Sequence, residues 1–286
     1  MSPGDRRPIG VFDSGIGGLS VLAALRAELP AEDFVYFADT GHAPYGERGA
    51  DYVVERTRAV AAELIEGERI KALVVACNTA TAAAIHLLRA DLPGFPLVGV
   101  EPALKPAVAA SRTGRIAVLA TRGTVSSARF ARLLSEHSQK TTFAVQACDG
   151  LARAIEAGEP GPVAELCARY VAQAGRFGTA PGEIDTLVLG CTHYPFVAGE
   201  LRRHTGDAVR FIETGVPVAL QTRRLLASAG MLAPADRDDA PDGDDGIGRG
   251  IGADVAERMG TVRLMGTGDP LVLQAAATRW LDGPRG

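Results

Sequence analysis

Short apolar runs that suit β-strands alternate along most of the chain with longer runs that suit helices. The strand-like runs cover residues 9–12, 33–39, 72–76, 97–100, 115–121, 142–147 and 186–190. Helix-like runs lie between them, at 15–29, 56–67, 79–90, from about 102, at 124–136, at 162–174 and up to 201. This alternation predicts parallel sheets covered by helices, with ligands bound at the carboxyl ends of the strands.

Length and charge narrow the classes of function. At 286 residues the chain is long enough for two α/β domains, and a net charge of −4 gives no general attraction to nucleic acid or to an anionic membrane. No apolar run is long enough to span a membrane, and the first ten residues lack the apolar core of a signal peptide. Four cysteines without a CxxC pair suit a reducing compartment, so a cytoplasmic location is expected.

Two segments, one in each half of the chain, share an order of residues. "ALVVACNTATAAA" (72–84) and "DTLVLGCTHYPF" (185–196) each run from an apolar strand to a cysteine, two polar residues and an expected helix. Taken singly, Cys77 and Cys191 would be small buried residues. As a pair at matching strand ends they are candidate reactive thiols, because a helix amino terminus favours the thiolate.

Other interpretations of the cysteines stay open. Cys148 and Cys167 lack this setting, and Cys167, within a helix-like run, is expected to pack in the core. Zinc usually requires three or four grouped ligands, and no further cluster accompanies Cys191 and His193, so no metal site is expected. A redox pair of thiols is an alternative, although the spacing matches no oxidoreductase motif.

Two loops add polar groups at expected strand ends. "VFDSGIGG" places Asp13 and Ser14 after the first strand, where a capped tight turn and a ligand-binding loop both fit. A phosphate loop is less expected because no lysine follows the glycines. The loop at 37–49 supplies Tyr45 and Gly46 and is too rich in glycine and proline to be a helix.

The segment 234–257 interrupts the alternation. It is rich in aspartate and glycine and has few apolar residues to bury, so a solvated flexible loop is expected. Its "GRGIGA" approaches a dinucleotide-binding fingerprint, but no strand precedes it, and a nucleotide site is not expected.

Four segments together carry a family resemblance. "GVFDSGIGGLSV", "YFADTGHAPYG", "VVACNTATAAA" and "LVLGCTHYP" resemble, in the same order, the signature segments of the glutamate racemases, which are cofactor-independent amino-acid racemases. The similarity extends to "RFIETG" and "TGDPLVLQAAATRWL" near the end of the chain. Two departures are Asp149 with Gly150, where the family usually has proline, and Glu213, where it usually has aspartate.

The resemblance implies roles for five residues. Cys77 and Cys191 would be the acid/base pair at the α-carbon, with Cys77 acting on the D-enantiomer and Cys191 on the L-enantiomer. Asp13 and His193 resemble the groups that manage protonation of Cys77 and Cys191 respectively. Glu156 matches a glutamate near the second cysteine, although a solvated helix carboxylate fits this position as well.

Further positions match the family's substrate-binding residues and offer hydroxyl, amide and backbone donors to the two carboxylates of glutamate. These are Ser14, Tyr45, Gly46, Asn78, Thr79, Thr121, Thr124 and Thr192, together with Asp13 and His193. Thiol acid/base chemistry needs no electron sink, so no cofactor is expected. Of the three lysines, which a pyridoxal enzyme would need, only Lys105 lies near an expected strand end.

The expected fold is two similar three-layer α/β domains with mainly parallel sheets and an active site in the cleft between them. The first domain would comprise residues 1–101 and 212–286, and the second would comprise residues 102–211.

The implied activity is that of an isomerase that interconverts L- and D-glutamate and supplies D-glutamate for peptidoglycan, cell-wall biogenesis and cell shape. Members of the family often form dimers, so a homodimer is one expectation. Alternatives are a racemase for aspartate or another acidic amino acid, and a non-catalytic small-ligand or redox-sensing protein.

Overall fold

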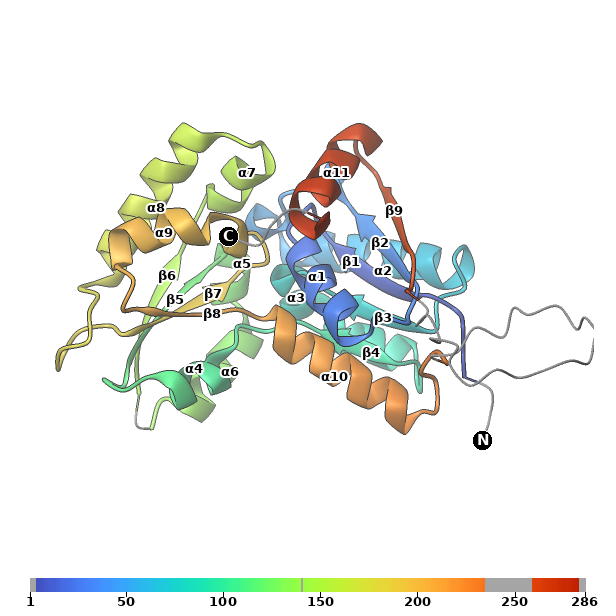
Figure 1. Ribbon diagram of the computed structural model, residues 1–286, viewed down its shortest axis with the longest axis horizontal. Helices are drawn as coiled ribbons and strands as arrows, with labels where there is room; N and C mark the ends of the chain where they lie inside the picture. Colours follow the sequence, from blue (N-terminus) through green and yellow to red (C-terminus); the bar gives the residue numbers. More distant parts are fainter. Residues whose placement is uncertain (1–3, 140, 235–258, 283–286) are drawn as a thin grey trace, which may run out of the picture.

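The structure is a computed structural model that describes residues 4–139, 141–234 and 259–282. Its strands form two separate parallel sheets (Figure 1). The first has the order β4-β3-β1-β2-β9, with β1 at Ile9–Asp13, β2 at Phe34–Ala38, β3 at Ala72–Val75, β4 at Leu97–Gly99 and β9 at Val262–Gly266. The second has the order β6-β5-β7-β8, with β5 at Arg115–Ala120, β6 at Thr142–Ala147, β7 at Thr186–Gly190 and β8 at Arg210–Ile212.

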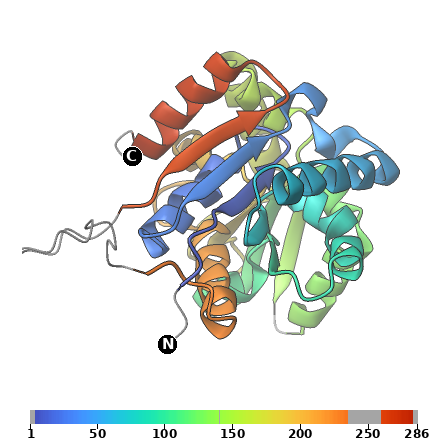
Figure 2. The same ribbon diagram turned by 90° about the vertical axis from the view of Figure 1, so that its right-hand side faces the viewer.

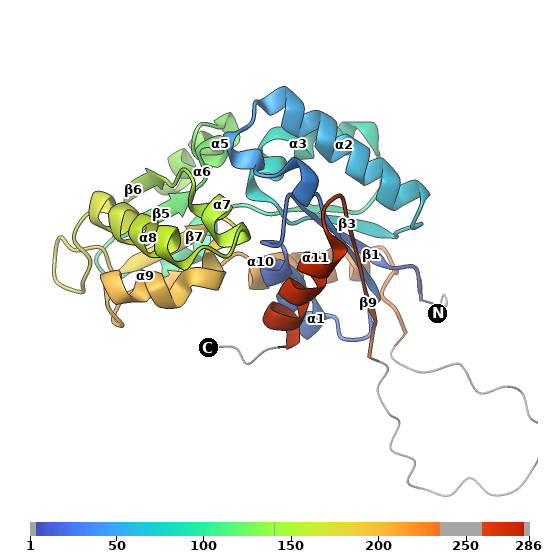
Figure 3. The same cartoon turned by 90° about the horizontal axis from the view of Figure 1, so that it is seen from above.

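Helices cover both faces of the first sheet (Figure 3). One face carries α2 (Ala50–Glu66) and α3 (Asn78–Asp91); the other carries α1 (Leu19–Glu28), α10 (Gly215–Ser228) and α11 (Pro270–Ala277). Successive strand residues face opposite ways, so Val11 packs with α1 and Phe12 packs with α2. Short helical turns complete this first unit: η1 at Thr40–His42, η2 at Tyr45–Glu47 and η4 at Thr278–Asp282.

The second sheet is covered in the same way. One face carries α7 (Leu151–Glu156), α8 (Pro160–Ala174) and α9 (Ala198–Thr205), and the other carries α4 (Leu104–Ala110) and α6 (Ala128–His137). The short α5 (Arg122–Val125) and η3 (Tyr194–Val197) follow β5 and β7. This second unit, like the first, has three layers, so the predicted fold class of two α/β units with mainly parallel sheets is confirmed.

The chain leaves the first unit and later returns to it. Strand β8 leads out of the second unit into α10, which packs against α1, and β9 then joins the edge of the first sheet beside β2 (Figure 2). We propose that each unit is a domain, with the division near residues 101 and 211 that the sequence predicts. The last residue of β8 is Ile212, so the second unit reaches one residue beyond that limit.

Some elements differ from the pattern in the sequence. The helix predicted at 124–136 is two helices, α5 and α6, because the Ser127 side chain caps a new helix by accepting a hydrogen bond from Phe130 N at 3.1 Å. The 3-10 turn η3, with Pro195 near its start, stands between Cys191 and α9, where a continuous helix was expected. The predicted flexible loop at 234–257 lies outside the described residues, apart from Pro234.

Candidate active site

A cavity of about 240 Å³ lies between the carboxyl ends of the two sheets. Its walls come from both units, because the loops after β1, β2 and β3 meet those after β5, β6 and β7. It brings together twelve of the thirteen predicted site residues: Asp13, Ser14, Tyr45, Gly46, Cys77, Asn78, Thr79, Thr121, Glu156, Cys191, Thr192 and His193. The thirteenth, Thr124, stands behind the wall, where its hydroxyl lies 3.0 Å from that of Thr121.

Cys77 lies at the amino terminus of α3, as the sequence predicts. It is the N-cap residue, and its sulfur accepts a hydrogen bond from Ala80 N at 3.5 Å. The Ser14 hydroxyl lies 3.6 Å from the same sulfur. Cys77 is 5% exposed and lines the cavity, so solvent reaches it through the cavity.

Burial of Cys77 opposes the effect of the helix terminus, which favours the thiolate. Burial raises the pKa of the Cys77 thiol well above its usual value, and the negative charge of Asp13 raises it further. The hydrogen bonds from Ala80 N and Ser14 lower this pKa, as a helix terminus should, but burial outweighs them. Cys77 is therefore held as a thiol until a neighbouring group or a bound ligand changes the balance.

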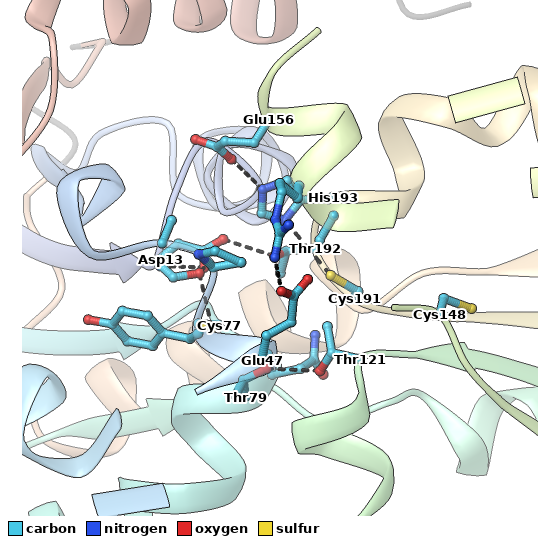
Figure 4. Close-up of a pocket in the computed structure, with 18 of the residues that line it drawn as sticks. Asp13, Glu47, Cys77, Thr79, Thr121, Cys148, Glu156, Cys191, Thr192 and His193 are labelled. Carbon is cyan, nitrogen blue, oxygen red and sulfur yellow. Dashed lines mark hydrogen bonds and ion pairs between the residues drawn. The ribbon is translucent and has the colours of Figure 1, made fainter. Parts of the chain in front are cut away.

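Cys191 faces a chain of two acid/base side chains (Figure 4). His193 Nδ1 lies 3.8 Å from the Cys191 sulfur, and His193 Nε2 lies 2.5 Å from Glu156 Oε2. The Glu156 carboxylate also accepts the backbone N–H of Ile16 at 3.0 Å, which ties α7 to the glycine-rich loop of the first unit. Glu156 is therefore a partner of His193 and of the opposite unit, and its interpretation as a solvated helix carboxylate is wrong.

These partners determine the charge on His193. Burial alone would lower its pKa, but the hydrogen bonds to Cys191 and Glu156, together with the charge of Glu156, raise the pKa well above the ordinary 6.5. A protonated ring can donate to Glu156 through Nε2 and to the sulfur through Nδ1 at the same time. His193 can therefore pass a proton to and from Cys191 while its second nitrogen stays bonded.

Asp13 joins the two halves of the site. Its carboxylate is fully buried, accepts Ser14 N at 2.6 Å, and accepts the Thr192 hydroxyl of the second unit at 2.8 Å. Burial raises the pKa of Asp13, against the opposing effects of His193 and Thr192. An acid whose pKa is raised in this way, next to Cys77, is suited to exchanging a proton with it.

The glycine-rich loop after β1 allows this close approach. A Cβ at Gly17 would lie 2.7 Å from Thr192 Oγ1 and would collide with the His193 ring, and a Cβ at Gly15 would lie 2.7 Å from the Glu156 carboxyl carbon. Side chains at these two positions would push the second unit away. The loop is thus a tight contact surface between the units, and also holds Asp13 and Ser14 as predicted.

Asn78 is the residue most clearly prepared for a ligand. It is 4% exposed, lines the cavity, and neither Oδ1 nor Nδ2 has a hydrogen-bond partner among the described residues. Buried polar atoms without partners are costly, so a ligand that supplies them would be favoured. The hydroxyl of Thr79, the next residue of α3, lies 2.9 Å from that of Thr121 and connects the two units (Figure 4).

The hydroxyl of Tyr45 is bonded within the first unit. It donates to Asp39 Oδ2 at 2.5 Å, away from the cavity, and Asp39 in turn accepts from Arg56 at 2.9 and 3.0 Å and from Thr267 at 2.8 Å. This cluster anchors the loop that follows β2. The backbone of Tyr45 and Gly46 is then the part of this loop that can face a ligand.

The structure also brings residues to the cavity that the sequence patterns did not indicate. Cys148 follows β6 directly and lines the cavity, so its strand-end position was the signal for it. Its sulfur points away from the cluster around His193 in Figure 4, and burial raises its pKa, as for a packing residue. Asp149 and Gly150, the departure from the family pattern, also line the cavity, as do Arg122, Arg153 and Glu47.

Two other features are absent from the described part of the chain, a metal-binding cluster and a membrane-spanning helix. No group of three or more His, Cys, Asp or Glu side chains there is arranged to hold a metal ion. Among the helices of residues 4–139, 141–234 and 259–282, none has the length and apolar character needed to cross a membrane.

The fold and the site define a class: α/β proteins of two similar units in which both units present cysteine side chains to a shared cavity. Comparison with known families gives a specific assignment. The chain belongs to the Asp/Glu/hydantoin racemase family, whose model matches residues 9–222.

Individual relatives agree with this assignment. A glutamate racemase of Pseudomonas syringae pv. tomato is 46% identical over 235 residues, which cover 82% of this chain and 83% of that protein. The crystal structure of glutamate racemase isoform RacE1 from Bacillus anthracis is similar with a TM-score of 0.78 and 28% identity, over 97% of this chain and 95% of that one. An Escherichia coli glutamate racemase, solved with L-glutamate and the activator UDP-MurNAc-Ala, gives a TM-score of 0.73 and 30% identity over 96% of this chain and 95% of that one.

Proposed function

We propose that this protein is a glutamate racemase that interconverts L- and D-glutamate by acid/base chemistry at Cys77 and Cys191, without a cofactor. The observation that carries the proposal is that Cys77 and Cys191, one from each unit, line the same cavity, and that each has its own acid/base neighbour, Asp13 for Cys77 and His193 for Cys191. Relatives at 46% identity named glutamate racemase support the substrate.

The proposed reaction needs two groups on opposite sides of one carbon. One cysteine, as thiolate, removes the α-proton from one face and becomes a thiol, and the electron pair left on the α-carbon delocalises into the neighbouring carboxylate. The other cysteine, as thiol, gives its proton to the opposite face and becomes a thiolate. No atom is gained or lost overall, and the enzyme finishes with its two protonation states exchanged.

The two partners would prepare these states. His193 can donate to Cys191 or take up its proton because its raised pKa keeps a proton available in the buried site. Asp13 would play the corresponding role for Cys77. A buried carboxyl with a raised pKa can accept the proton that a thiol must lose. By family resemblance, we propose that Cys77 acts on D-glutamate and Cys191 acts on L-glutamate.

Substrate recognition is proposed to use neutral groups. Within the described part of the chain, neither polar atom of the Asn78 amide has a protein partner, and hydroxyls surround the same cavity, from Ser14, Thr79, Thr121 and Thr192. Thr124 would act behind Thr121 through the hydroxyl chain. Hydrogen bonds from such groups can hold two carboxylates without a cation that would compete with the thiol chemistry.

The cellular role follows from the proposed activity together with the family resemblance. We propose that the protein works in the cytoplasm and supplies D-glutamate for peptidoglycan. A homodimer remains a prediction from the resemblance.

The proposal is tested by incubating the protein with L-glutamate or D-glutamate in deuterated water without pyridoxal phosphate. We expect loss of optical rotation and a deuterium atom at the α-carbon of the inverted product. L-Aspartate, tested in parallel, should react far more slowly. If neither amino acid shows optical change or deuterium uptake, the proposed activity is wrong; faster reaction with aspartate would make the aspartate racemase alternative the better one.

A further inference from the structure

One ion pair crosses the cavity between the two units and has no part in the chemistry proposed above. Glu47, at the end of η2 in the first unit, pairs with the guanidinium of Arg153 on α7 in the second unit. Both residues line the cavity. Figure 4 shows the Glu47 carboxylate reaching across from the side of the cavity opposite to Glu156.

This pair differs from the buried contacts between the units. The Asp13 bond to Thr192 is deep in the site, where these residues are 0% and 2% exposed. In contrast, the side chains of Glu47 and Arg153 are 32% and 62% exposed. The pair therefore lies where the cavity meets solvent, and we call Glu47 with Arg153 the mouth pair.

The reactive thiols are reached through this part of the cavity. Cys77 and Cys191 are each 5% exposed, and the walls that cover them come from different units. Separation of the walls, or movement of the side chains at the mouth, would widen the path to the thiols. An ion pair that joins η2 to α7 opposes both motions, and breaking it costs less than breaking a buried contact because water solvates the separated charges.

We propose that the mouth pair is an electrostatic latch that sets how often the cavity opens, and so governs entry and release of the acidic amino acid. The inference rests on the proposed function for its substrate, but the latch itself concerns access to the two thiols. Glu47 and Arg153 would be residues that control substrate exchange, without contact to the reacting carbon.

The molecule contains a matched control for this idea. Arg122 also lines the cavity, is 65% exposed, and pairs with Asp149. Both of these residues belong to the second unit, so their ion pair does not join the two units. Replacing Arg122 therefore removes a similar charge from the same rim and leaves the connection between the units in place.

The test measures how fast iodoacetamide alkylates each cysteine of the full-length protein, followed by peptide mass spectrometry, with no substrate present. We expect Glu47→Gln and Arg153→Gln each to speed alkylation of both Cys77 and Cys191 by about two- to five-fold, the range that an exposed ion pair can supply. Cys167, which is 0% exposed in the core of the second unit, serves as the internal reference and should not change.

Further variants distinguish the effect of the ion pair between the units from the effect of losing a charge at the rim of the cavity. Arg122→Gln should leave the alkylation rates unchanged. The exchanged variant, Glu47→Arg with Arg153→Glu, should return both rates close to those of the natural protein, because it restores an attractive pair across the mouth. High salt should speed alkylation in the natural protein and have less effect in Glu47→Gln, since salt screens exposed charges.

Two results would overturn the latch. One is alkylation that is unchanged in both single variants; the other is alkylation in the exchanged variant that is as fast as in the single variants. Faster alkylation of Cys167 in step with the cavity thiols would mean that the substitutions loosen the whole fold, which also contradicts the proposal. None of these readings uses racemisation, so failure of the proposed function would leave the test intact.

Discussion

At the scale of single residues, the surroundings of the His193 side chain give the clearest indication of the chemistry of the site. The imidazole is buried between a thiol and a carboxylate, at 3.8 Å from Cys191 and 2.5 Å from Glu156. In the sequence, His193 lies two residues after Cys191. That spacing is compatible with zinc binding, with packing and with acid/base chemistry. The contact with Glu156 favours acid/base chemistry, because a carboxylate on the far nitrogen orients the ring and supports its charged form.

Replacing this imidazole should therefore slow racemisation. We expect His193→Asn to lower kcat/KM by about 10²- to 10⁴-fold, the usual contribution of a positioned acid/base group. The factor should be equal in both directions, because the two enantiomers have the same free energy. His204→Asn is the matched control, since His204 pairs with Glu200 on the surface of α9 and should leave the rate unchanged. A full rate in His193→Asn would contradict the role.

The raised pKa of His193 also predicts how stability depends on pH. From about pH 6.5 upward the unfolded chain releases the histidine proton, while the folded protein keeps it until the raised pKa is reached. The contribution of His193 to stability is thus complete below pH 6.5 and is lost as pH rises through the folded pKa. Urea unfolding should show this decline in the natural protein and a weaker decline in His193→Asn; parallel curves would contradict it.

Residues such as Asp13 and Cys77 could be predicted because each follows an apolar strand in its own segment. Glu156 could be selected only by family resemblance, because its partner His193 is on another element. Nothing local marked Glu47 and Arg153, whose relation exists only across the two units. The partners of the Tyr45 side chain, Asp39 and through it Arg56, could not be predicted either, because the fold brings them together from separate elements.

At the scale of elements, the loop after β2 depends on a buried acid. Asp39 is 0% exposed and holds Tyr45, Arg56 and Thr267 on the two oxygens of its carboxylate. These bonds, with Arg56 above all, keep the pKa of Asp39 below its usual value although burial opposes this. The loop that presents Tyr45 and Gly46 to the cavity is fixed through this cluster.

Removing the arginine tests the cluster. We expect Arg56→Met to lower the free energy of unfolding by about 3 kcal/mol, because it leaves the Asp39 carboxylate buried without its cation. Arg58→Met, on the same helix α2, removes an exposed ion pair with Asp91 and should cost at most about 1 kcal/mol. The measurement is urea unfolding of the two variants, and equal losses would contradict the assigned role of Asp39.

Helices and strands could largely be predicted where a run of apolar residues in the sequence indicates them. The bounds of β6 and β7 agree with the runs at 142–147 and 186–190, because these strands are bordered by polar or small residues. The short α7 is not among the helix-like runs of the sequence, although a helix was considered around Glu156. Its six residues are stabilised by packing on α8 and by contacts to the first unit more than by their own pattern.

At the scale of the whole molecule, the two units are similar in build. Cys77 in the first unit and Cys191 in the second each follow a strand and line the same cavity. The matching segments around Cys77 and Cys191 predicted this pairing, because parallel sheets present the ends of their strands to ligands. The sequence could not predict how the units meet. That depends on small residues such as Gly17, which lets the loop after β1 approach Thr192 and His193.

The proton exchange of single-cysteine variants tests the account most directly. In deuterated water, Cys77→Ser should exchange the α-proton of L-glutamate through Cys191 without forming D-glutamate, and Cys191→Ser should exchange that of D-glutamate without forming L-glutamate. Proton NMR with chiral chromatography measures both, and circular dichroism checks the fold. Racemisation at the natural rate by either variant would contradict the two-thiol mechanism, and exchange of the opposite enantiomer would contradict the assignment of the faces.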